Sequence, residues 1–220
     1  MTTTHDRTGA RVVGAYIDAV DWGSCLNRIF DWATHRESRY TCLCNAHSVV
    51  TARRDPGFGR TIDEADLAVP DGAPVAWRLG ALGFPGQPRI SGSELMWKCC
   101  ARAAGEGVPV FLYGGRPETL RRLSARLAHE FPRLKIAGCY APPFRPLTTG
   151  EDAQVANAID GHLVDFQIRK FVLALQYFRS AHAGRTQIDA DHACLWPAHG
   201  VFGRLRSSAA RHQNTVVLAE

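Results

Sequence analysis

Residues 108–131 read VPVFLYGGRPETLRRLSARLAHEF, and this stretch decides the fold class. The apolar run at residues 108–113 predicts a buried strand, and the two glycines that follow turn the chain. Pro117 occupies a natural first position for a helix that continues to residue 131. A strand, a tight turn and a helix in succession form the repeating unit of a parallel α/β sheet.

The same alternation extends in both directions from this stretch. Further strands are expected at residues 12–17, 40–45, 67–69 and 135–140, and helices at residues 26–33, 47–53, 73–82, 93–104 and 151–159. A turn is expected at residues 55–57, which read DPG, and a short helical piece after it. We therefore predict an α/β fold, a Rossmann-like parallel sheet with helices on both faces and ligands at the carboxyl ends of its strands.

The pattern weakens past residue 161, where residues 166–178 fit either a strand or a buried helix. We expect a flexible N-terminus at residues 1–10, a Rossmann-like domain at residues 11–165 and a divergent, irregular C-terminal segment at residues 166–220. The basic residues between 201 and 212 fit a membrane-touching piece or a surface helix.

Composition narrows the class of protein further. Apolar residues make up 45% of the 220 residues and charged residues 21%, which is ordinary for a globular chain. The sequence contains no run of 18 uncharged apolar residues, so no membrane-spanning helix is predicted. The first ten residues are polar and show no secretory signal, so we expect a cytoplasmic protein. The odd number of cysteines, seven, favours reduced core thiols over a disulfide framework. Cys42, Cys44 and His47 lie close enough in sequence to suggest metal binding, but no second pair completes such a site.

The positive charge lies in the second half of the chain. Residues 1–110 carry 12 basic and 12 acidic groups, whereas residues 111–220 carry 14 and 9, and only three of the 26 basic residues are lysine. Arginine holds phosphate with a planar pair of donors, so a phosphate-bearing partner suits this half. An arginine-rich solvated surface explains the same charge, and nothing in the pattern indicates nucleic acid.

Asp71 is the first candidate for catalysis. It follows the strand at residues 67–69 on a Pro–Asp–Gly turn, where it can accept a proton from an attacking hydroxyl. A turn aspartate that bonds its own backbone is the alternative.

The turn at Gly114, Gly115 and Arg116, after Tyr113, can hold a phosphate through backbone N–H groups and the positive end of the next helix. Arg89 precedes a second helix start at Ser91, Gly92 and Ser93, and can neutralise a leaving diphosphate without a metal ion. A tight connection and a solvated arginine are the structural alternatives for these two motifs.

The remaining motifs are weaker indications of function. Residues 63–66 (DEAD) lack the phosphate loop of a helicase, and the glycine turn lacks the fingerprint of a nicotinamide cofactor site. Asp189 and Asp191 have the D-x-D spacing of a metal-dependent nucleotide-sugar enzyme, but three-residue patterns recur by chance. Ser91 lacks the preceding glycine of a nucleophile elbow.

Six stretches taken in order resemble the WecG/TagA/CpsF family of glycosyltransferases. They are VGAYID (13–18), NAHSVV (45–50), ADLAVPDG (65–72), RISGSEL (89–95), FLYGGRP (111–117) and FPRLKIAG (131–138). The resemblance covers about residues 11–165.

The resemblance implies an inverting enzyme that moves a sugar, of hexose or N-acetylhexosamine type, from a UDP-sugar to a lipid-diphosphate-linked acceptor in envelope or exopolysaccharide synthesis. It implies no cofactor and no metal, a peripheral position at the membrane, and possible homo-oligomers. The family base falls on Asp71 beside Gly72, the asparagine of its T-x-N motif on Asn45, and its arginine on Arg89. Leu43 stands at the threonine position of that motif.

The resemblance ends where the family has a G-x-G-x-P-x-Q-E stretch, which residues 161–220 lack. A nucleotide-binding relative without turnover is therefore the alternative function.

Overall fold

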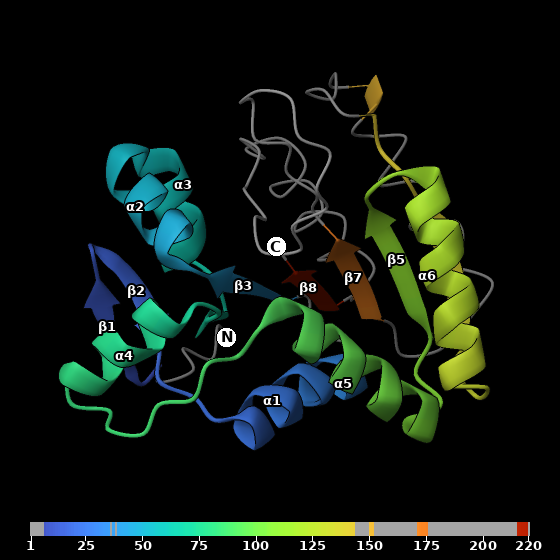
Figure 1. Cartoon of the computed structure of the whole chain (residues 1–220), viewed down its shortest axis with the longest axis horizontal. Helices are drawn as coiled ribbons and strands as arrows, with labels where there is room; N and C mark the ends of the chain where they lie inside the picture. The colour runs from blue at the N-terminus through green and yellow to red at the C-terminus, as the bar shows by residue number, and fades with distance from the viewer. Residues whose placement is uncertain are drawn as a thin grey trace.

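The structure is a computed structural model that describes residues 7–35, 37, 39–143 and 150–151, and the backbone of residues 171–175 and 215–219. Its centre is a six-stranded parallel sheet with the order β4-β3-β8-β7-β5-β6, and a two-stranded antiparallel hairpin lies beside it (Figure 1). Helices lie on both faces of the sheet where β3 and β4 form it. The predicted Rossmann-like α/β class is therefore confirmed.

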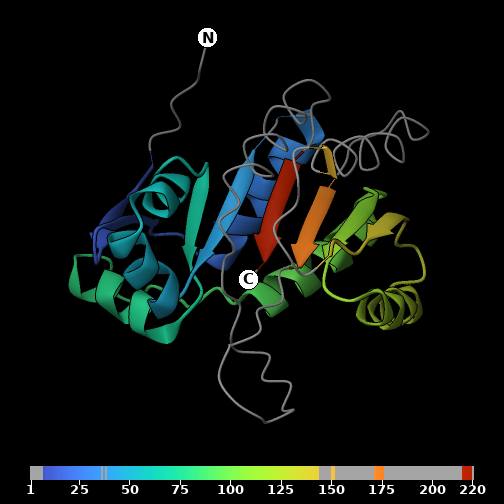
Figure 2. The same cartoon turned by 90° about the horizontal axis from the view of Figure 1, so that it is seen from above.

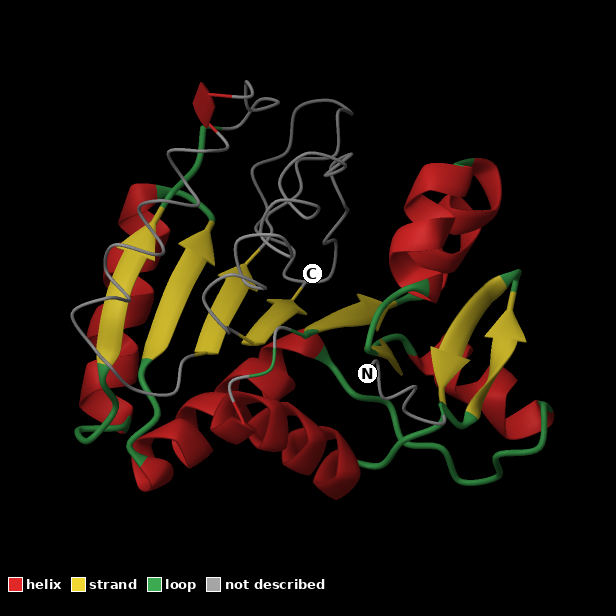
Figure 3. Cartoon of the chain, turned by 180° about the vertical axis from the view of Figure 1, so that it is seen from behind, coloured by secondary structure: helices red, strands yellow, loops and turns green. Residues whose placement is uncertain are grey.

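The sheet is assembled from three parts of the chain. Its strands are β3 (Tyr40–Cys44), β4 (Leu67–Pro70), β5 (Val110–Gly114), β6 (Ile136–Tyr140), β7 (Phe171–Leu175) and β8 (Thr215–Ala219). The last two come from the C-terminal segment and lie between β3 and β5, as Figure 3 shows. Of the two possibilities left open for residues 166–178, the structure has a strand at β7, and residues 215–219 form a second strand, β8. The membrane-touching piece or surface helix expected at residues 201–212 falls outside the described residues.

The N-terminal hairpin corrects one prediction. The single strand expected at residues 12–17 is wrong, because β1 (Gly9–Val12) and β2 (Ala15–Asp18) are two antiparallel strands. Val13 and Gly14 form the turn between them with φ of 53° and 100°. Valine rarely takes a positive φ, so its apolar side chain made the turn read as a continuation of the strand.

Helices divide between the two faces of the sheet (Figure 2). On one face, α1 (Trp22–His35), α5 (Gly92–Glu106) and α6 (Pro117–Glu130) bury their apolar sides in one cluster that also contains Leu43 and Leu112. On the other, α2 (Ala46–Arg54), α3 (Pro56–Asp63) and α4 (Ala73–Ala81) form a second cluster with the hairpin. The short helical piece expected after residues 55–57 is confirmed as α3, but it begins earlier than expected: Asp55 separates α2 from α3, and its carboxylate caps the first amides of α3, to which Pro56 and Gly57 already belong.

The sequence of β4 explains why it is buried on both faces. Leu67 and Val69 join the first cluster, whereas Ala68, between them, joins the second. Side chains alternate between the faces of a strand, so a parallel strand covered on both sides needs an unbroken apolar run.

The described cysteines are all free, as expected for reduced thiols. Cys25, Cys42, Cys44, Cys99 and Cys100 are buried and a sixth, at position 139, is exposed. Burial raises the pKa of Cys25 and of Cys100 to about 12, because a thiolate loses its hydration in the apolar core.

Candidate functional site

Asp71 leaves the sheet at the carboxyl end of β4. Its backbone N–H donates to the carbonyl of Cys44 at 3.1 Å, which extends the β3–β4 ladder by one residue. Gly72 then begins α4 as its N-cap, with Pro74 in the first turn. The Asp71 side chain is half-buried. Strand pairing on one side and a helix start on the other thus fix the backbone that carries this carboxylate.

Asn45 lies at the end of the neighbouring strand β3. Its Oδ1 accepts from the N–H of Ser48 at 3.0 Å, while the Ser48 hydroxyl accepts from the Asn45 N–H, so the two residues form a capping box at the start of α2. Gly72 comes close to this cap, because a Cβ at that position would lie 3.4 Å from the Cα and the Cβ of Asn45. Asn45 and the turn after Asp71 are therefore in contact.

The segment before α5 closes around the same turn. The Arg89 Nε donates to the carbonyl of Asp71 at 2.6 Å, and the Ile90 N–H donates to the carbonyl of Pro70 at 2.9 Å. The Gly92 N–H, in the first turn of α5, donates to Asp71 Oδ1 at 3.2 Å. A carboxylate, an exposed guanidinium and the positive end of a fifteen-residue helix thus meet at one point.

The start of α5 keeps hydrogen-bonding capacity for an anion. Ser91 is its N-cap and makes no side-chain capping bond, and Ser93, in the first turn, is exposed. The first amides of a helix have no partner within the helix, so they can donate to phosphate oxygens.

The glycine turn lies at the same edge of the sheet but at another position along it. Gly114 and Gly115 have φ of 108° and 69°, which L side chains rarely adopt, and Arg116 is the N-cap of α6. Tyr113, 7% exposed, stacks on Tyr140 with ring centroids 6.0 Å apart. The predicted strand, turn and helix start are confirmed here.

The sheet order sets the spacing between these two groups of predicted residues. It brings together Asn45, Asp71, Gly72, Arg89 and the start of α5. The turn at Gly114 belongs to β5, four positions from β4 in the sheet, which corresponds to about 19 Å at the usual strand spacing. A ligand that contacts both groups must therefore be extended along the edge.

Asp18 is a residue near the site whose role the sequence did not reveal. It is 1% exposed, and its Oδ2 accepts from the N–H of Ala68 on β4 at 2.6 Å. Arg7 holds the same carboxylate with its Nε at 3.0 Å and its Nη2 at 2.8 Å. Asp18 therefore fastens the outer edge of the strand that carries Asp71. Its place at the end of the stretch VGAYID was the available signal, but an isolated acidic residue after a strand specifies no contact.

The other motifs take structural roles where the structure describes them. Asp63 accepts from the Tyr16 N–H, and Asp66 accepts from Arg39 and from the Tyr40 N–H, so residues 63–66 connect elements of the fold. Leu43, at the position of the family threonine, is buried in the core. Asp189 and Asp191 lie outside the described residues.

In the part of the chain that the structure describes, no three His, Cys, Asp or Glu side chains gather in a way that would hold a metal ion. No helix in the described ranges combines the length and hydropathy needed to cross a bilayer.

A Rossmann-like sheet that places a carboxylate, an arginine and a helix N-terminus at the end of one strand has the architecture of an α/β group-transfer enzyme. A family model described as "Glycosyl transferase WecG/TagA/CpsF family" matches residues 10–166. The match spans well over half of the 220 residues and contains every residue of the candidate site. The chain belongs to this family of glycosyltransferases.

Proposed function

We propose that this chain is an inverting glycosyltransferase that moves a hexose or N-acetylhexosamine unit from a UDP-sugar to a lipid-diphosphate-linked acceptor. The observation that carries the proposal is the gathering of Asn45, Arg89 and the start of α5 around Asp71, inside the region that matches the family. A transferase of this kind needs a base for the acceptor hydroxyl and positive charge for the leaving nucleotide.

Asp71 is the proposed base. The acceptor hydroxyl oxygen forms the new bond to the anomeric carbon while the bond from that carbon to the diphosphate oxygen breaks. The hydroxyl proton passes to the Asp71 carboxylate, and UDP leaves with the electron pair of the broken bond. The hydrogen bond from the Gly92 N–H to Oδ1 fixes the orientation of the carboxylate during this step. Asn45, in contact with the same turn, would orient the acceptor or the sugar.

Arg89 and the first turn of α5 are the proposed binding site for the diphosphate. Arg89 uses its Nε to hold the Asp71 carbonyl, and the two terminal nitrogens of its guanidinium can donate to phosphate oxygens. The amide of Ser93 and the positive end of the helix add to this attraction. These groups supply the charge that a metal ion provides in other transferases, so the proposed reaction needs no cofactor.

The glycine turn would contact the far end of the donor. Because β5 is about 19 Å along the edge from β4, Tyr113, Gly114, Gly115 and Arg116 are better placed for the nucleoside end of a UDP-sugar than for the leaving oxygen. Arg116 and the N-terminus of α6 still supply positive charge at that position.

A lipid-linked acceptor would place the enzyme at the cytoplasmic face of the membrane as a peripheral protein, in envelope or exopolysaccharide synthesis. We also propose that the chain forms homo-oligomers.

The proposal is tested by incubating the full chain with UDP-hexose and UDP-N-acetylhexosamine donors and a lipid-diphosphate saccharide, with released UDP and glycosylated lipid measured together. Equimolar formation of both products, with inversion at the anomeric carbon, is expected. UDP release without glycosylated lipid, or the absence of both products with every donor, contradicts the proposal.

A second candidate function is a nucleotide-binding relative without turnover. It is favoured by the end of the family match at residue 166, with 54 residues of the chain beyond it. Calorimetric titration with UDP separates the two functions when it is combined with the transfer assay. Binding without transfer supports the second function, and binding with transfer supports the first.

A further inference from the structure

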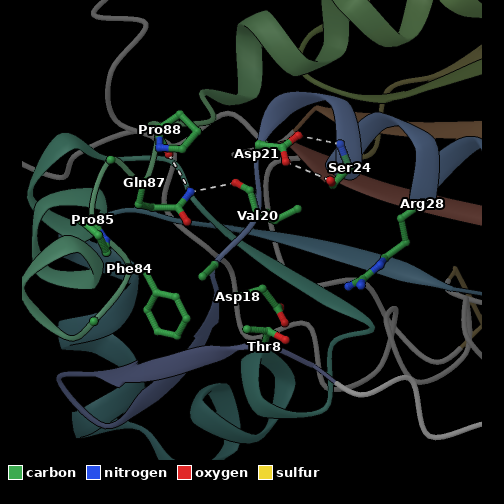
Figure 4. Close-up of a pocket in the computed structure, with 13 residues that line it drawn as sticks. Thr8, Asp18, Val20, Asp21, Ser24, Arg28, Phe84, Pro85, Gln87 and Pro88 are labelled. Carbon is green, nitrogen blue, oxygen red and sulfur yellow. Dashed lines mark hydrogen bonds between the residues drawn. The ribbon is translucent and has the colours of Figure 1, made fainter.

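A cavity of about 520 Å³ lies outside the candidate site (Figure 4). It is an open pocket lined by the end of β2, the connection to α1, the first turns of α1 and the loop at residues 83–88. None of the residues proposed for sugar transfer lines it. Its volume falls in the range of small-molecule sites, which is about 300–1,000 Å³.

Two carboxylates in the wall of the cavity already have donors from the protein. Asp18 accepts from Arg7 and from the Ala68 N–H. Asp21 accepts from the Ser24 N–H at 2.8 Å and from the Ser24 hydroxyl at 2.9 Å. These two bonds lower the pKa of Asp21, so it is a carboxylate at neutral pH. The charge of Asp18 is thus paired with Arg7, whereas Asp21 holds the first turn of α1 through Ser24 and keeps its negative charge.

The third charged side chain that lines the cavity is Arg28, on α1. It projects from α1 toward the side of the cavity where Asp18 and Thr8 lie (Figure 4) and is half-buried. Within the described residues it forms no ion pair and no hydrogen bond. A guanidinium has five N–H donors in a planar fork that matches a carboxylate or a phosphate. Among the charged side chains that line this cavity in the described residues, Arg28 is therefore the cation, and its N–H donors are available to an anion.

The opposite wall is apolar and fixed in place. Phe84, Pro85 and Pro88 supply apolar surface from the loop. Gln87 fastens the loop to the β2–α1 connection, because its Nε2 donates to the carbonyl of Val20 at 2.7 Å and to that of Pro88 at 3.0 Å. This wall would accommodate a ring-sized apolar body across the cavity from Arg28.

We propose that this cavity is a binding site for a small molecule that carries one carboxylate or phosphate group on an apolar, ring-sized body. The anionic group pairs with Arg28, and the body lies against Phe84, Pro85 and Pro88.

The loop connects this site to the candidate base. Immediately after Pro88, Arg89 and Ile90 bond to the backbone of Asp71 and Pro70, and the Gly92 N–H bonds to the Asp71 side chain. A ligand that stabilises residues 83–88 therefore also restrains the segment that holds Asp71. Slower exchange of the amide hydrogens of Ile90 and Gly92 is the expected sign of this restraint.

The test uses benzoate and phenyl phosphate as probes on the full chain, with binding measured by calorimetry. We expect at least one probe to bind at millimolar concentration or below. The Arg28→Gln variant should lose about tenfold or more in affinity, Arg28→Lys should lose less and Arg28→Glu should abolish binding. The control variant Arg53→Gln, at an exposed position on α2, should bind as the wild type does. Thermal unfolding of each variant shows whether it is folded.

The probes separate the two anion chemistries, since preference for benzoate indicates a carboxylate ligand and preference for phenyl phosphate a phosphate ligand. Hydrogen exchange locates the bound probe, and protection is expected in residues 83–92. Failure of both probes to bind overturns the proposal. Equal binding by Arg28→Glu and the wild type, or protection confined to residues 110–117 at the glycine turn, also overturns it.

Discussion

Asp71 and Gly114 both end a strand at the carboxyl edge of one sheet, and both precede a helix, yet their surroundings differ. Around Asp71, backbone and side-chain bonds come from β3 and from the segment before α5, and Gly72 touches the cap of α2. The turn at Gly114 and Gly115 instead passes directly into the N-cap of its own helix. One region is assembled from distant parts of the chain, and the other from consecutive residues.

The difference shows that local sequence specifies the shape of a turn, whereas contacts between segments create a chemical site. The strand that carries Asp71 is held from outside by Asp18 and Arg7, which form a buried polar contact. The strand that ends at Gly114 rests on an apolar cluster that includes Val110, Leu112 and Leu120. The two strand ends should therefore respond differently to substitution, pH and ligand.

The largest effect on stability is expected at Asp18. Asp18→Ala removes the acceptor of the Ala68 N–H and leaves Arg7 partly buried without its partner. Breaking a buried pair on one side typically costs about 3–5 kcal/mol, so the free energy of unfolding should fall by about 3 kcal/mol or more. Chemical denaturation measures it.

Glu118→Gln is the matched control for Asp18→Ala at the other strand end, because Glu118 forms exposed ion pairs on α6 with Arg121 and Arg122. Exposed pairs contribute little to stability, so the free energy of unfolding of Glu118→Gln should fall much less than that of Asp18→Ala. Equal losses in the two variants would show that Asp18 does not fasten β4.

A pH effect should arise in the cluster beneath β5. Burial raises the pKa of Cys25 to about 12, whereas an unfolded thiol titrates near its ordinary value, 9.0 for this group. Above pH 9 the unfolded state loses this proton and the folded state keeps it, so stability falls with rising pH up to about pH 12. Cys25 should account for about 1 kcal/mol of this loss by pH 10.

The comparison of Cys25→Ala with Cys139→Ala isolates this contribution. Cys139 is exposed, so its variant should lose stability between pH 8 and pH 10 as the wild type does, while Cys25→Ala should lose less. Identical pH dependence in the two variants would exclude a role for the Cys25 proton.

Arg89 and Arg116 test which strand end binds the diphosphate. Arg89→Gln should weaken UDP binding about tenfold, because hydrogen bonds to charged groups contribute about 1.5–3 kcal/mol. Arg116→Gln, at the far end of the proposed donor site, should weaken it by less. Calorimetric titration with UDP measures both. The reverse order of effects would move the diphosphate to the glycine turn.

A small effect on stability is expected at Gly115. The Cβ of a substituted alanine would make an ordinary van der Waals contact with Thr119 at 3.9 Å, but φ of 69° is costly for a residue with a Cβ. The free energy of unfolding of Gly115→Ala should fall by about 1 kcal/mol. Thermal denaturation checks this value. A neutral substitution would mean that the turn does not require a glycine conformation.

The sequence predicted the glycine turn and α6 because both depend on neighbouring residues. Val13 was misread because its side chain fits a strand while its backbone turns. Asp71 was identified as a candidate from its place after β4, but the contacts made by Arg89 and Gly92 depend on how separate segments pack. The sequence did not predict the roles of Asp18 and Arg28, because these roles depend on contacts with distant residues and not on the spacing of apolar residues.

The central claim is that the Asp71 carboxylate accepts the proton of the acceptor hydroxyl. The most direct test measures the sugar-transfer rate and the UDP affinity on the same preparations of wild type and variant. In Asp71→Asn the side chain keeps its size and can still accept from the Gly92 N–H, but it is no longer a base. The sugar-transfer rate should fall by about 10²-fold or more while the UDP affinity stays within about threefold of the wild type. A transfer rate equal to that of the wild type would contradict the claim.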